Sequence, residues 1–280
     1  MSRMSVRARE RRGFAIRSIV MIVLTIAMAL PLYYVVISSF KTQPDMSNSP
    51  FGLPSTWIFD NYVTAFMSES VWRSFVNTII VTVLGVMLQV LVGSMAAYGM
   101  ILRSGRLTAM IGALLVLAFC IPMQSTIIPL YKLEAKFGLV NSLTGLVILY
   151  LSGAIFCYFL IVGYMRKLPM EMIEAAKIDG AGPFRIYGTI VLPLIKPILI
   201  TVIVFQTLGT WNDFVWPNLL LSSAEKRTVV LQVFNAMGQF TTNWPLFMTI
   251  TVVVLIPVFV FFLFCQRWIV AGLVAGSVKG

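Results

Sequence analysis

Histidine is absent from the 280 residues of this sequence. Its absence excludes His-based general acid–base chemistry, Ser-His-Asp triads and most zinc sites. The sequence also lacks a phosphate loop of the GxxxxGKS/T type, so hydrolysis of nucleotides by the chain itself has no support. We therefore expect a protein that is not an enzyme, with no catalytic residue, no metal site and no cofactor bound by the chain itself.

Cysteine and charged residues are scarce. The three cysteines, Cys120, Cys157 and Cys265, lie far apart in separate apolar runs. Their spacing fits neither a disulfide framework nor a metal site, so we expect three buried, unreactive thiols. Charged residues make up 11% of the chain and hydrophobic residues 59%, whereas an ordinary soluble domain has about 25% charged residues. This composition indicates a membrane protein.

Six apolar segments are long enough to cross a bilayer, because a helix needs about 20 mainly apolar residues to span a hydrocarbon core of about 30 Å. The first segment is longer than the core of a signal peptide and no small-residue cleavage site follows it, so we expect it to be retained. Pro122 and Pro129 predict a break near the end of the third segment. We predict one all-α, polytopic transmembrane domain over residues 1–280. Its six predicted spans are 14–40, 72–102, 107–130, 142–165, 192–221 and 245–268.

The lysines and arginines near the ends of these spans indicate the orientation, because cytoplasmic loops carry an excess of them. In a six-span arrangement, 15 of the 21 lie on the side that holds both termini. The 166–191 connection and the 269–280 tail are then cytoplasmic, and the 41–71 and 222–244 loops are external. Orientation and attraction to anionic lipid account for the basic N-terminus, so we expect the lipid bilayer as its partner and no nucleic acid. The 15 residues are Arg3, Arg7, Arg9, Arg11, Arg12, Arg17, Arg103, Arg106, Arg166, Lys167, Lys177, Arg185, Lys196, Arg267 and Lys279.

The stretch LPMEMIEAAKIDGAGP, residues 168–183, is unusually charged for this chain. Pro169 suits the first turn of a helix, and Gly180 suits its C-terminal stop. Glu174 and Lys177 are three residues apart and can pair. An interfacial helix lying on the bilayer and a docking helix for a cytoplasmic partner are both compatible with this pattern. The abrupt Gly-Ala-Gly-Pro stop favours docking.

A docking helix in this position would present an apolar ridge to its partner. Met170, Ile173 and Ala176 or Lys177 lie along one side of the predicted helix, and Met172 and Ile178 flank the charged positions at its edges.

The same stretch carries a motif with two matched ends. Glu174-Ala175-Ala176, three residues, Gly180, nine residues and then Ile190-x-Leu192-Pro193 matches the EAA loop of ATP-binding-cassette (ABC) importer permeases in full. Four further stretches resemble the six-span permease of maltose-type sugar importers, so that the resemblance covers nearly the whole chain. They are PSTWIFDNYVTAF (54–66), PLYKLEAKFGLVNS (129–142), WNDF (211–214) and GLVAGSVKG (272–280), where Ser277 stands in place of the more usual alanine or glycine.

This resemblance implies the type I ABC importer permease fold in a bacterial cytoplasmic membrane, with the core of that fold over about residues 71–268. It implies a subunit that translocates a sugar or related polyol by alternating access. The implied partners are two cytoplasmic ATPase subunits that use ATP and Mg, a second and different permease subunit, and an extracytoplasmic sugar-binding protein. In this family the EAA element is a coupling helix that sits in a cleft of an ATPase subunit. The coupling residues expected here are Glu171, Glu174, Ala175, Ala176, Asp179, Gly180 and Pro193.

Polar side chains within the spans are candidates for the path of the substrate, because such groups are costly in lipid unless they face protein or water. Hydrogen bonding between packed helices is the alternative role for each of them. Asp213 lies about 30 Å beyond Pro193 along a straight helix, so we expect it near the outer end of the fifth span and not as a proton relay. The candidates are Asn77, Gln89, Gln124, Gln206, Thr210, Trp211, Asn212 and Asp213.

Two other classes of protein compete with the importer permease. An ion-coupled secondary sugar carrier usually needs ionisable groups near the centre of its spans, and we find none there. An intramembrane enzyme remains possible through a Ser-Lys pair, for which no convincing spacing is present. The sequence leaves the cargo open among disaccharides, oligosaccharides, polyols and glycerol phosphate, whose importers share these motifs.

Overall fold

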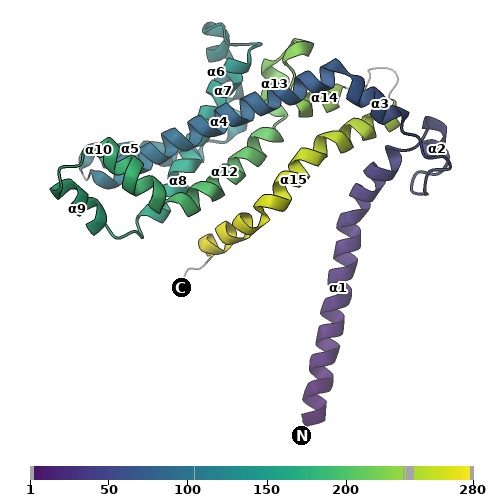
Figure 1. Ribbon diagram of the computed structural model, residues 1–280, viewed down its shortest axis with the longest axis horizontal. Helices are drawn as coiled ribbons and strands as arrows, with labels where there is room; N and C mark the ends of the chain where they lie inside the picture. Colours follow the sequence, from purple (N-terminus) through teal and green to yellow (C-terminus); the bar gives the residue numbers. More distant parts are fainter. Residues whose placement is uncertain (1–2, 104, 236, 238–242, 278–280) are drawn as a thin grey trace. The chain divides into compact units, whose positions relative to one another are not determined.

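The computed structural model describes residues 3–103, 105–235, 237 and 243–277, and all the regular elements in these residues are helices (Figure 1). This agrees with the all-α prediction. The chain divides into two compact units. The first comprises Met1–Ser68 and Val233–Ile256, and the second comprises Glu69–Gln232 and Pro257–Gly280.

The first unit contains α1 (Arg3–Ser38), α2 (Gln43–Asn48), α3 (Asp60–Met67) and the first part of α15 (Trp244–Ser277). The buried Lys41 organises the turn after α1, because its Nζ donates hydrogen bonds to the backbone oxygens of Ser49 (2.6 Å) and Pro50 (3.1 Å). The Thr249 hydroxyl donates to the backbone oxygen of Ser39 (3.0 Å) and joins the start of α15 to the end of α1. Both α2 and α3 lie within the 41–71 loop, which we predict to be external.

The second unit is built around α4 (Glu69–Leu102), a helix of 34 residues. A second apolar segment packs along α4 and consists of α7 (Leu143–Tyr150), the 3-10 turn η1 (Leu151–Gly153) and α8 (Ala154–Met165). The helix α12 (Lys196–Trp211) packs against both α4 and α8. Three shorter elements follow α12 along the chain. They are α13 (Val215–Leu220), η3 (Ala224–Lys226) and α14 (Val229–Asn235). The last residues of α14 belong to the first unit.

Gly93 allows the closest approach between α4 and α8. A β-carbon at this position would lie 2.5 Å from Cβ of Cys157 and 2.8 Å from the backbone oxygen of Ala154. Small residues at helix crossings let the backbones of membrane helices approach and gain van der Waals contact. The contact between α4 and α8 therefore depends on the absence of a side chain at Gly93.

Two of the predicted spans are bent. The predicted third span, 107–130, consists of α5 (Arg106–Cys120) and α6 (Met123–Lys136), which meet at an angle of 103°. Pro122 lies at this break, and its ring prevents the continuation of α5. The prediction of a break near Pro122 is therefore confirmed, although the helical segment continues beyond residue 130.

The fifth span differs more from its prediction. Instead of one helix over 192–221, the structure has a short helical segment over Pro183–Leu194 that meets α12 at an angle of 79°. The helix α12 ends at Trp211, and α13 is separate. The bend lies at Ile195, directly before Lys196-Pro197, where proline is tolerated because it falls in the first turn of α12. The segment before the bend comprises α10 (Pro183–Ile186), the π-helical turn η2 (Tyr187–Val191) and α11 (Leu192–Leu194).

Among the described residues, four helices are suited by length and composition to crossing a membrane, or six if each bent pair forms one span. The four are Gly13–Ser38, Glu69–Leu102, Leu143–Met165 and Trp244–Trp268. They agree with the first, second, fourth and sixth predicted spans to within a few residues. The helix α15 continues through Ser277, so the predicted start of the tail at residue 269 is not a helix end.

Two clusters of buried apolar side chains stabilise the second unit. One joins α4 and α8 to the segment around the fifth-span bend and includes Ala97, Ile161, Ile186 and Ile195. The other joins α4, α7 and α13 and includes Val81, Leu146, Trp216 and Leu220. The prediction of buried thiols is confirmed for Cys157 and Cys265 and wrong for Cys120, which is exposed at the end of α5, a helix without a buried residue.

Candidate coupling helix and polar cavity

The predicted cytoplasmic docking element forms the helix α9 (Glu171–Ile178). It begins at Glu171, two residues after Pro169, so Pro169 precedes the helix and does not lie in its first turn. Glu171 and Glu174 occupy the first turn, where negative charge interacts favourably with the helix dipole. The helix thus presents its acidic residues at one end and Lys177 at the other.

Gly180 ends this element with a left-handed backbone conformation, since its φ is +75°. The amide of Gly180 donates to the backbone oxygen of Lys177 (3.1 Å), and the amide of Ala181 donates to that of Ala176 (3.0 Å). Glycine is favoured in such C-terminal caps because a β-carbon is strained at this φ. A β-carbon at Gly180 would meet no atom within 4 Å, so the requirement for glycine here is conformational.

The apolar ridge expected on α9 does not face outward. Ile173 (3% exposed) and Ala176 (8%) pack into the cluster around the fifth-span bend. The exposed apolar side chains are instead Met172 (47%), Ile178 (86%) and Phe184 (77%). The prediction of the ridge was wrong because the periodicity of a short helix does not reveal which of its faces packs on its own chain.

The charged side chains of α9 are free of ion pairs with one another. Glu174 and Lys177 do not form the expected salt bridge; in the described part of the chain, the ion pair is that of Arg73 with Glu69. The three charged residues among the predicted coupling residues are Glu171, Glu174 and Asp179; they are exposed, as are Ala175, Gly180 and Pro193. We call the exposed side chains of α9, of its C-cap Asp179 and of Phe184 the coupling surface; its members are Glu171, Met172, Glu174, Ala175, Lys177, Ile178, Asp179 and Phe184.

Two tyrosines tie the segment after α9 to α4. The buried Tyr187 hydroxyl lies 2.7 Å from Oγ of Ser94, and the Tyr98 hydroxyl donates to the backbone oxygen of Pro183 (3.0 Å). The rings of Tyr98 and Tyr187 lie 5.5 Å apart between centroids. Tyr187 opens the π-helical turn η2, a distortion found frequently at functional sites. In Figure 1, α9 and α10 lie near the C-terminal end of α4.

A second feature is a cavity of about 250 Å³ beside η1, which we call the polar cavity. It collects side chains from α4, α12 and the α7–η1 segment, and it brings together four of the eight predicted pathway residues. The residues used below are Gln89, Tyr150, Gly153, Gln206, Thr210 and Asp213.

Hydrogen bonds connect the walls of the polar cavity. Nε2 of Gln206 donates to Oε1 of Gln89 and to the backbone oxygen of Gly153 (3.2 Å). The Tyr150 hydroxyl donates to Oδ2 of Asp213 (2.6 Å). Asp213 lies two residues beyond the end of α12 and is bound to Tyr150, the residue that directly precedes η1.

The other four predicted pathway residues lie outside this cavity. Asn77 is buried, and its Nδ2 donates to the backbone oxygens of Glu225 (2.9 Å) and Arg227 (3.0 Å), which is the interhelical role considered as the alternative. Asn212 donates to the backbone oxygen of Leu208 and caps α12. Gln124 is exposed, and Trp211 lines a separate apolar cavity.

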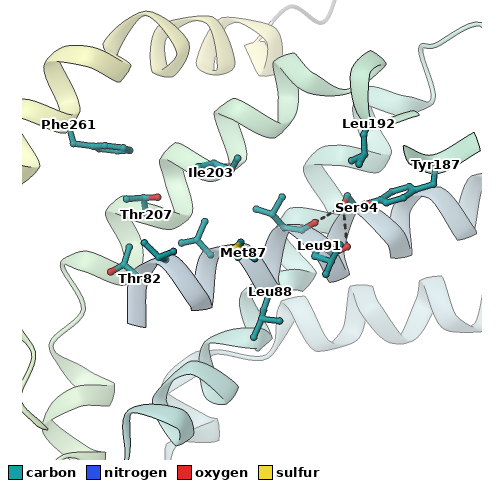
Figure 2. Close-up of a pocket in the computed structure, with 13 residues that line it drawn as sticks. Thr82, Met87, Leu88, Leu91, Ser94, Tyr187, Leu192, Ile203, Thr207 and Phe261 are labelled. Atoms are coloured by element: carbon teal, nitrogen blue, oxygen red, sulfur yellow. Dashed lines mark hydrogen bonds between the residues drawn. The ribbon is translucent and has the colours of Figure 1, made fainter. Parts of the chain in front are cut away.

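A larger cavity of about 520 Å³ lies along another side of α4, and we call it the apolar cavity (Figure 2). Ser94 and Tyr187 lie toward one end, and Thr82, Thr207 and Phe261 toward the other. Most of its remaining wall is aliphatic, so it offers few partners for the hydroxyl groups of a sugar.

Comparison with known proteins identifies the family. Residues 89–274 match the family model described as the binding-protein-dependent transport system inner membrane component. The chain belongs to this family. It is therefore a transmembrane permease subunit and not a catalytic one, as predicted.

Relatives of this permease align along nearly its whole length. It is 35% identical over 261 residues to the probable starch degradation products transport system permease protein AmyC of Thermoanaerobacterium thermosulfurigenes, covering 92% of this chain and 94% of that protein. It is 31% identical over 278 residues to the melibiose/raffinose/stachyose import permease protein MelC of Bacillus subtilis, covering 98% and 100%. These relatives confirm the resemblance to permeases of ABC sugar importers.

The fold also has a solved counterpart. A chain of the bacterial ABC transporter involved in the import of the acidic polysaccharide alginate superposes on this permease with a TM-score of 0.85, at 21% identity and with coverage of 95% of this chain and 98% of that one. This similarity confirms the predicted type I ABC importer permease fold.

Several residues of both sites were not predicted from the sequence. Phe184 of the coupling surface follows Pro183 in the connection between the fourth and fifth spans, and a large aromatic side chain in a connection that we predict to be cytoplasmic could have indicated it. Tyr150 and Gly153 lie inside an apolar run and carry no comparable signal. Their role depends on the 3-10 turn that interrupts the fourth span.

Proposed function

We propose that this permease carries a mono-, di- or oligosaccharide, or a related polyol, across a bacterial cytoplasmic membrane. Its relatives support a carbohydrate, because their names include starch degradation products, melibiose, diacetylchitobiose and arabinooligosaccharides. The substrate moves by alternating access, driven by ATP and Mg at separate ATPase subunits. Both termini and α9 face the cytoplasm, in keeping with the distribution of lysine and arginine.

The coupling surface is the observation that carries this proposal. It combines unpaired charges with two strongly exposed apolar side chains, Ile178 of α9 and Phe184 of α10, and the packing face of α9 is already buried against its own chain. Large apolar anchors surrounded by polar groups are typical of interaction hot spots. Glu174 makes a charge-assisted contact with the ATPase subunit, and Gly180 fixes the angle at which α9 is presented.

The permease works with further partners. A second, different permease subunit completes the pathway, two cytoplasmic ATPase subunits supply the energy, and an extracytoplasmic binding protein delivers the sugar. The kinds of partner are supported by fold neighbours: the alginate transporter has been solved with its alginate pentasaccharide-bound periplasmic protein, and another neighbour is the methionine ABC transporter MetNI.

The test replaces Gly180 with valine in the assembled transporter. Because valine is strained at a φ of +75°, the coupling surface shifts, and we expect sugar uptake and association of the ATPase subunit to fall at least about tenfold. Gly182→Val is the matched control, since Gly182 has an ordinary extended backbone (φ −69°, ψ 159°) and a β-carbon there meets no atom within 4 Å.

Uptake is measured in proteoliposomes with and without ATP inside. Normal uptake by the Gly180→Val variant would contradict the coupling role of α9. Uptake that needs no ATP and stops when an ion gradient is dissipated would favour an ion-coupled sugar carrier instead.

A further inference from the structure

The polar cavity lies beside a 3-10 turn within a membrane helix. The turn η1 (Leu151–Gly153) falls in the middle of the candidate span Leu143–Met165, which continues through it as one helix. A stretch of 3-10 geometry inside a longer helix often marks a functional hinge or a sequence under strain. The position of η1 therefore favours a functional role of the polar cavity over an ordinary packing defect.

The side-chain amides of Gln89 and Gln206, beside η1, retain unused hydrogen-bonding capacity. In the pair formed by Gln89 and Gln206, one amide group donates to the other amide oxygen, so one NH₂ group and one carbonyl oxygen have no partner among the described residues. This holds whichever way the two amides are oriented. The unpaired groups comprise both donors and an acceptor, which matches the hydroxyl groups of a sugar because each of these can donate and accept.

Asp213 and Thr210 add further groups to the same wall. The Asp213 carboxylate accepts hydrogen bonds from the Tyr150 hydroxyl (2.6 Å) and from the backbone amides of Val215 (3.0 Å), Phe214 and Trp216. These bonds hold the carboxylate in the wall of the polar cavity, where it contributes a negative charge. The Thr210 hydroxyl forms no hydrogen bond in the described part of the chain. A carboxylate at this place favours a neutral sugar over a uronate or a sugar phosphate.

The size of the polar cavity limits what it can hold. Its volume of about 250 Å³ lies just below the roughly 300–1,000 Å³ of sites for drug-sized ligands. One sugar ring fits such a space, whereas a di- or oligosaccharide must extend beyond it. The aromatic rings of Tyr150 and Trp216 in its wall provide surfaces for the apolar face of that ring.

We infer that the polar cavity is a subsite for one neutral pyranose unit of the transported carbohydrate, contacted by Gln89, Gln206, Thr210 and Asp213 of this chain. The sugar ring binds beside η1, with its hydroxyl groups on the unpaired amide groups and on the Thr210 hydroxyl, and the carboxylate lies next to it. The choice of a sugar as ligand rests on the proposed function. The subsite itself rests on the chemistry and the position of the cavity.

Two threonines on α12 provide a matched pair of variants. Thr210 lines the polar cavity, whereas Thr207 lies three residues earlier and lines the apolar cavity (Figure 2). Each change to alanine removes one hydroxyl and one methyl group from the same helix. Gln206→Leu removes a larger part of the proposed contact while keeping the side chain about the same size.

The experiment measures equilibrium binding of radiolabelled melibiose and maltotriose to the complete transporter, purified with its partner subunits and without the binding protein. We expect Thr210→Ala to raise the dissociation constant about three- to tenfold and Gln206→Leu at least about tenfold, as the loss of one or more hydrogen bonds predicts. Thr207→Ala should leave it unchanged. If the complex with Gln206→Leu does not assemble, the comparison of Thr210→Ala with Thr207→Ala tests the subsite by itself.

The outcomes distinguish the subsite from the proposed function. Equal dissociation constants for the wild type, Thr210→Ala and Thr207→Ala would overturn the subsite, as would the absence of binding of both sugars to the wild-type complex. ATP-dependent uptake of either sugar by the same complex, reconstituted together with its binding protein, would then leave the proposed function standing. Absence of ATP-dependent uptake together with absence of binding would overturn both.

Discussion

The helix α4 is joined to the bent fifth-span segment at two places, one on each side of the bend at Ile195. Before the bend, Ser94 and Tyr98 hold Tyr187 and Pro183 through hydroxyl hydrogen bonds and stacked rings. After it, Gln89 holds Gln206 through a pair of amides beside the polar cavity. We call these the tyrosine joint and the amide joint.

The two joints differ in what surrounds them. The tyrosine joint belongs to a cluster of buried apolar side chains that also takes up Ile173 of α9. Its contacts are fully formed and link α9 to α4, so the joint is suited to passing on a movement of the coupling surface. The amide joint borders a cavity and keeps unpaired hydrogen-bonding groups, so it is suited to exchanging partners with a ligand. The tyrosine joint, with its groups fully paired, and the amide joint, with groups free to bind a ligand, thus lie at the two ends of the interface between α4 and the fifth-span segment.

The largest effect is expected from Gly93→Val, because Gly93 lies on α4 between the two joints. The added side chain would enter the backbone and side chains of α8, with the β-carbon already 2.5 Å from Cβ of Cys157. Since backbone must move, we expect a loss of about 1–3 kcal/mol or more in unfolding free energy and damage to both joints. Thermal or denaturant unfolding in detergent measures it.

Gly99→Val is the control for this change, because a β-carbon at Gly99 on the same helix meets no atom within 4 Å. Similar destabilisation by both variants would show that helix propensity, and not the crossing of α4 with α8, causes the effect.

A smaller and more local effect is expected from Gly153→Ala. The new β-carbon would lie 2.5 Å from Nε2 of Gln206, which is the far end of a flexible side chain and can move away. The amide joint is then broken while the tyrosine joint stays intact. We expect about 1–3 kcal/mol of destabilisation from the loss of buried hydrogen bonds, together with weaker binding of sugar at an unchanged rate of ATP hydrolysis.

The control for Gly153→Ala is Gly163→Ala, at an open position on α8 where a β-carbon meets no atom within 4 Å. A rate of ATP hydrolysis that falls in parallel with sugar binding would contradict the separation of the two joints.

The smallest effect on stability is expected from Tyr187→Phe, which removes only the hydroxyl that contacts Ser94. We expect about 0.5–1.5 kcal/mol of destabilisation, but a clear fall in the ratio of sugar transported to ATP hydrolysed, because α9 loses a connection to α4. Tyr164→Phe is the control, since the Tyr164 hydroxyl has no hydrogen bond in the described part of the chain.

A double-mutant cycle with Ser94→Ala sharpens this prediction. The Ser94 hydroxyl also donates to the backbone oxygens of Val90 (2.6 Å) and Leu91 (3.1 Å), so Ser94→Ala has an effect of its own. If the two hydroxyls act on each other, the double variant should lose less stability than the sum of the two single losses. Simple addition would contradict the contact between Tyr187 and Ser94.

The sequence predicted the long apolar spans well and the contacts of α9 poorly. Spans are readable because about 20 apolar residues in succession suffice to identify each one. Ile173 and Ala176 were expected to face a partner, but they pack on the chain itself. A helix of eight residues has two apolar sides here, and only the position of α10 and η2 decides which side is covered.

The polar residues within the spans show a similar division. All eight pathway candidates were recognised as costly in lipid, yet four line the polar cavity and four do not. Gln89 and Gln206 are separated by 117 positions and Tyr150 and Asp213 by 63. No local pattern relates residues so far apart, and the 79° bend of the fifth span places them differently from the straight helix that was assumed.

By itself, the sequence determined the membrane class, the six apolar segments, the asymmetry of basic residues and the EAA motif, because each of these is a property of neighbouring residues along the chain. Only the tertiary structure decided which faces of the helices are buried, where the spans bend, and which amides meet at η1. The physical reason is that lipid tails are as apolar as leucine. Hydrophobicity therefore identifies a membrane helix but does not tell its lipid-facing side from its protein-facing side.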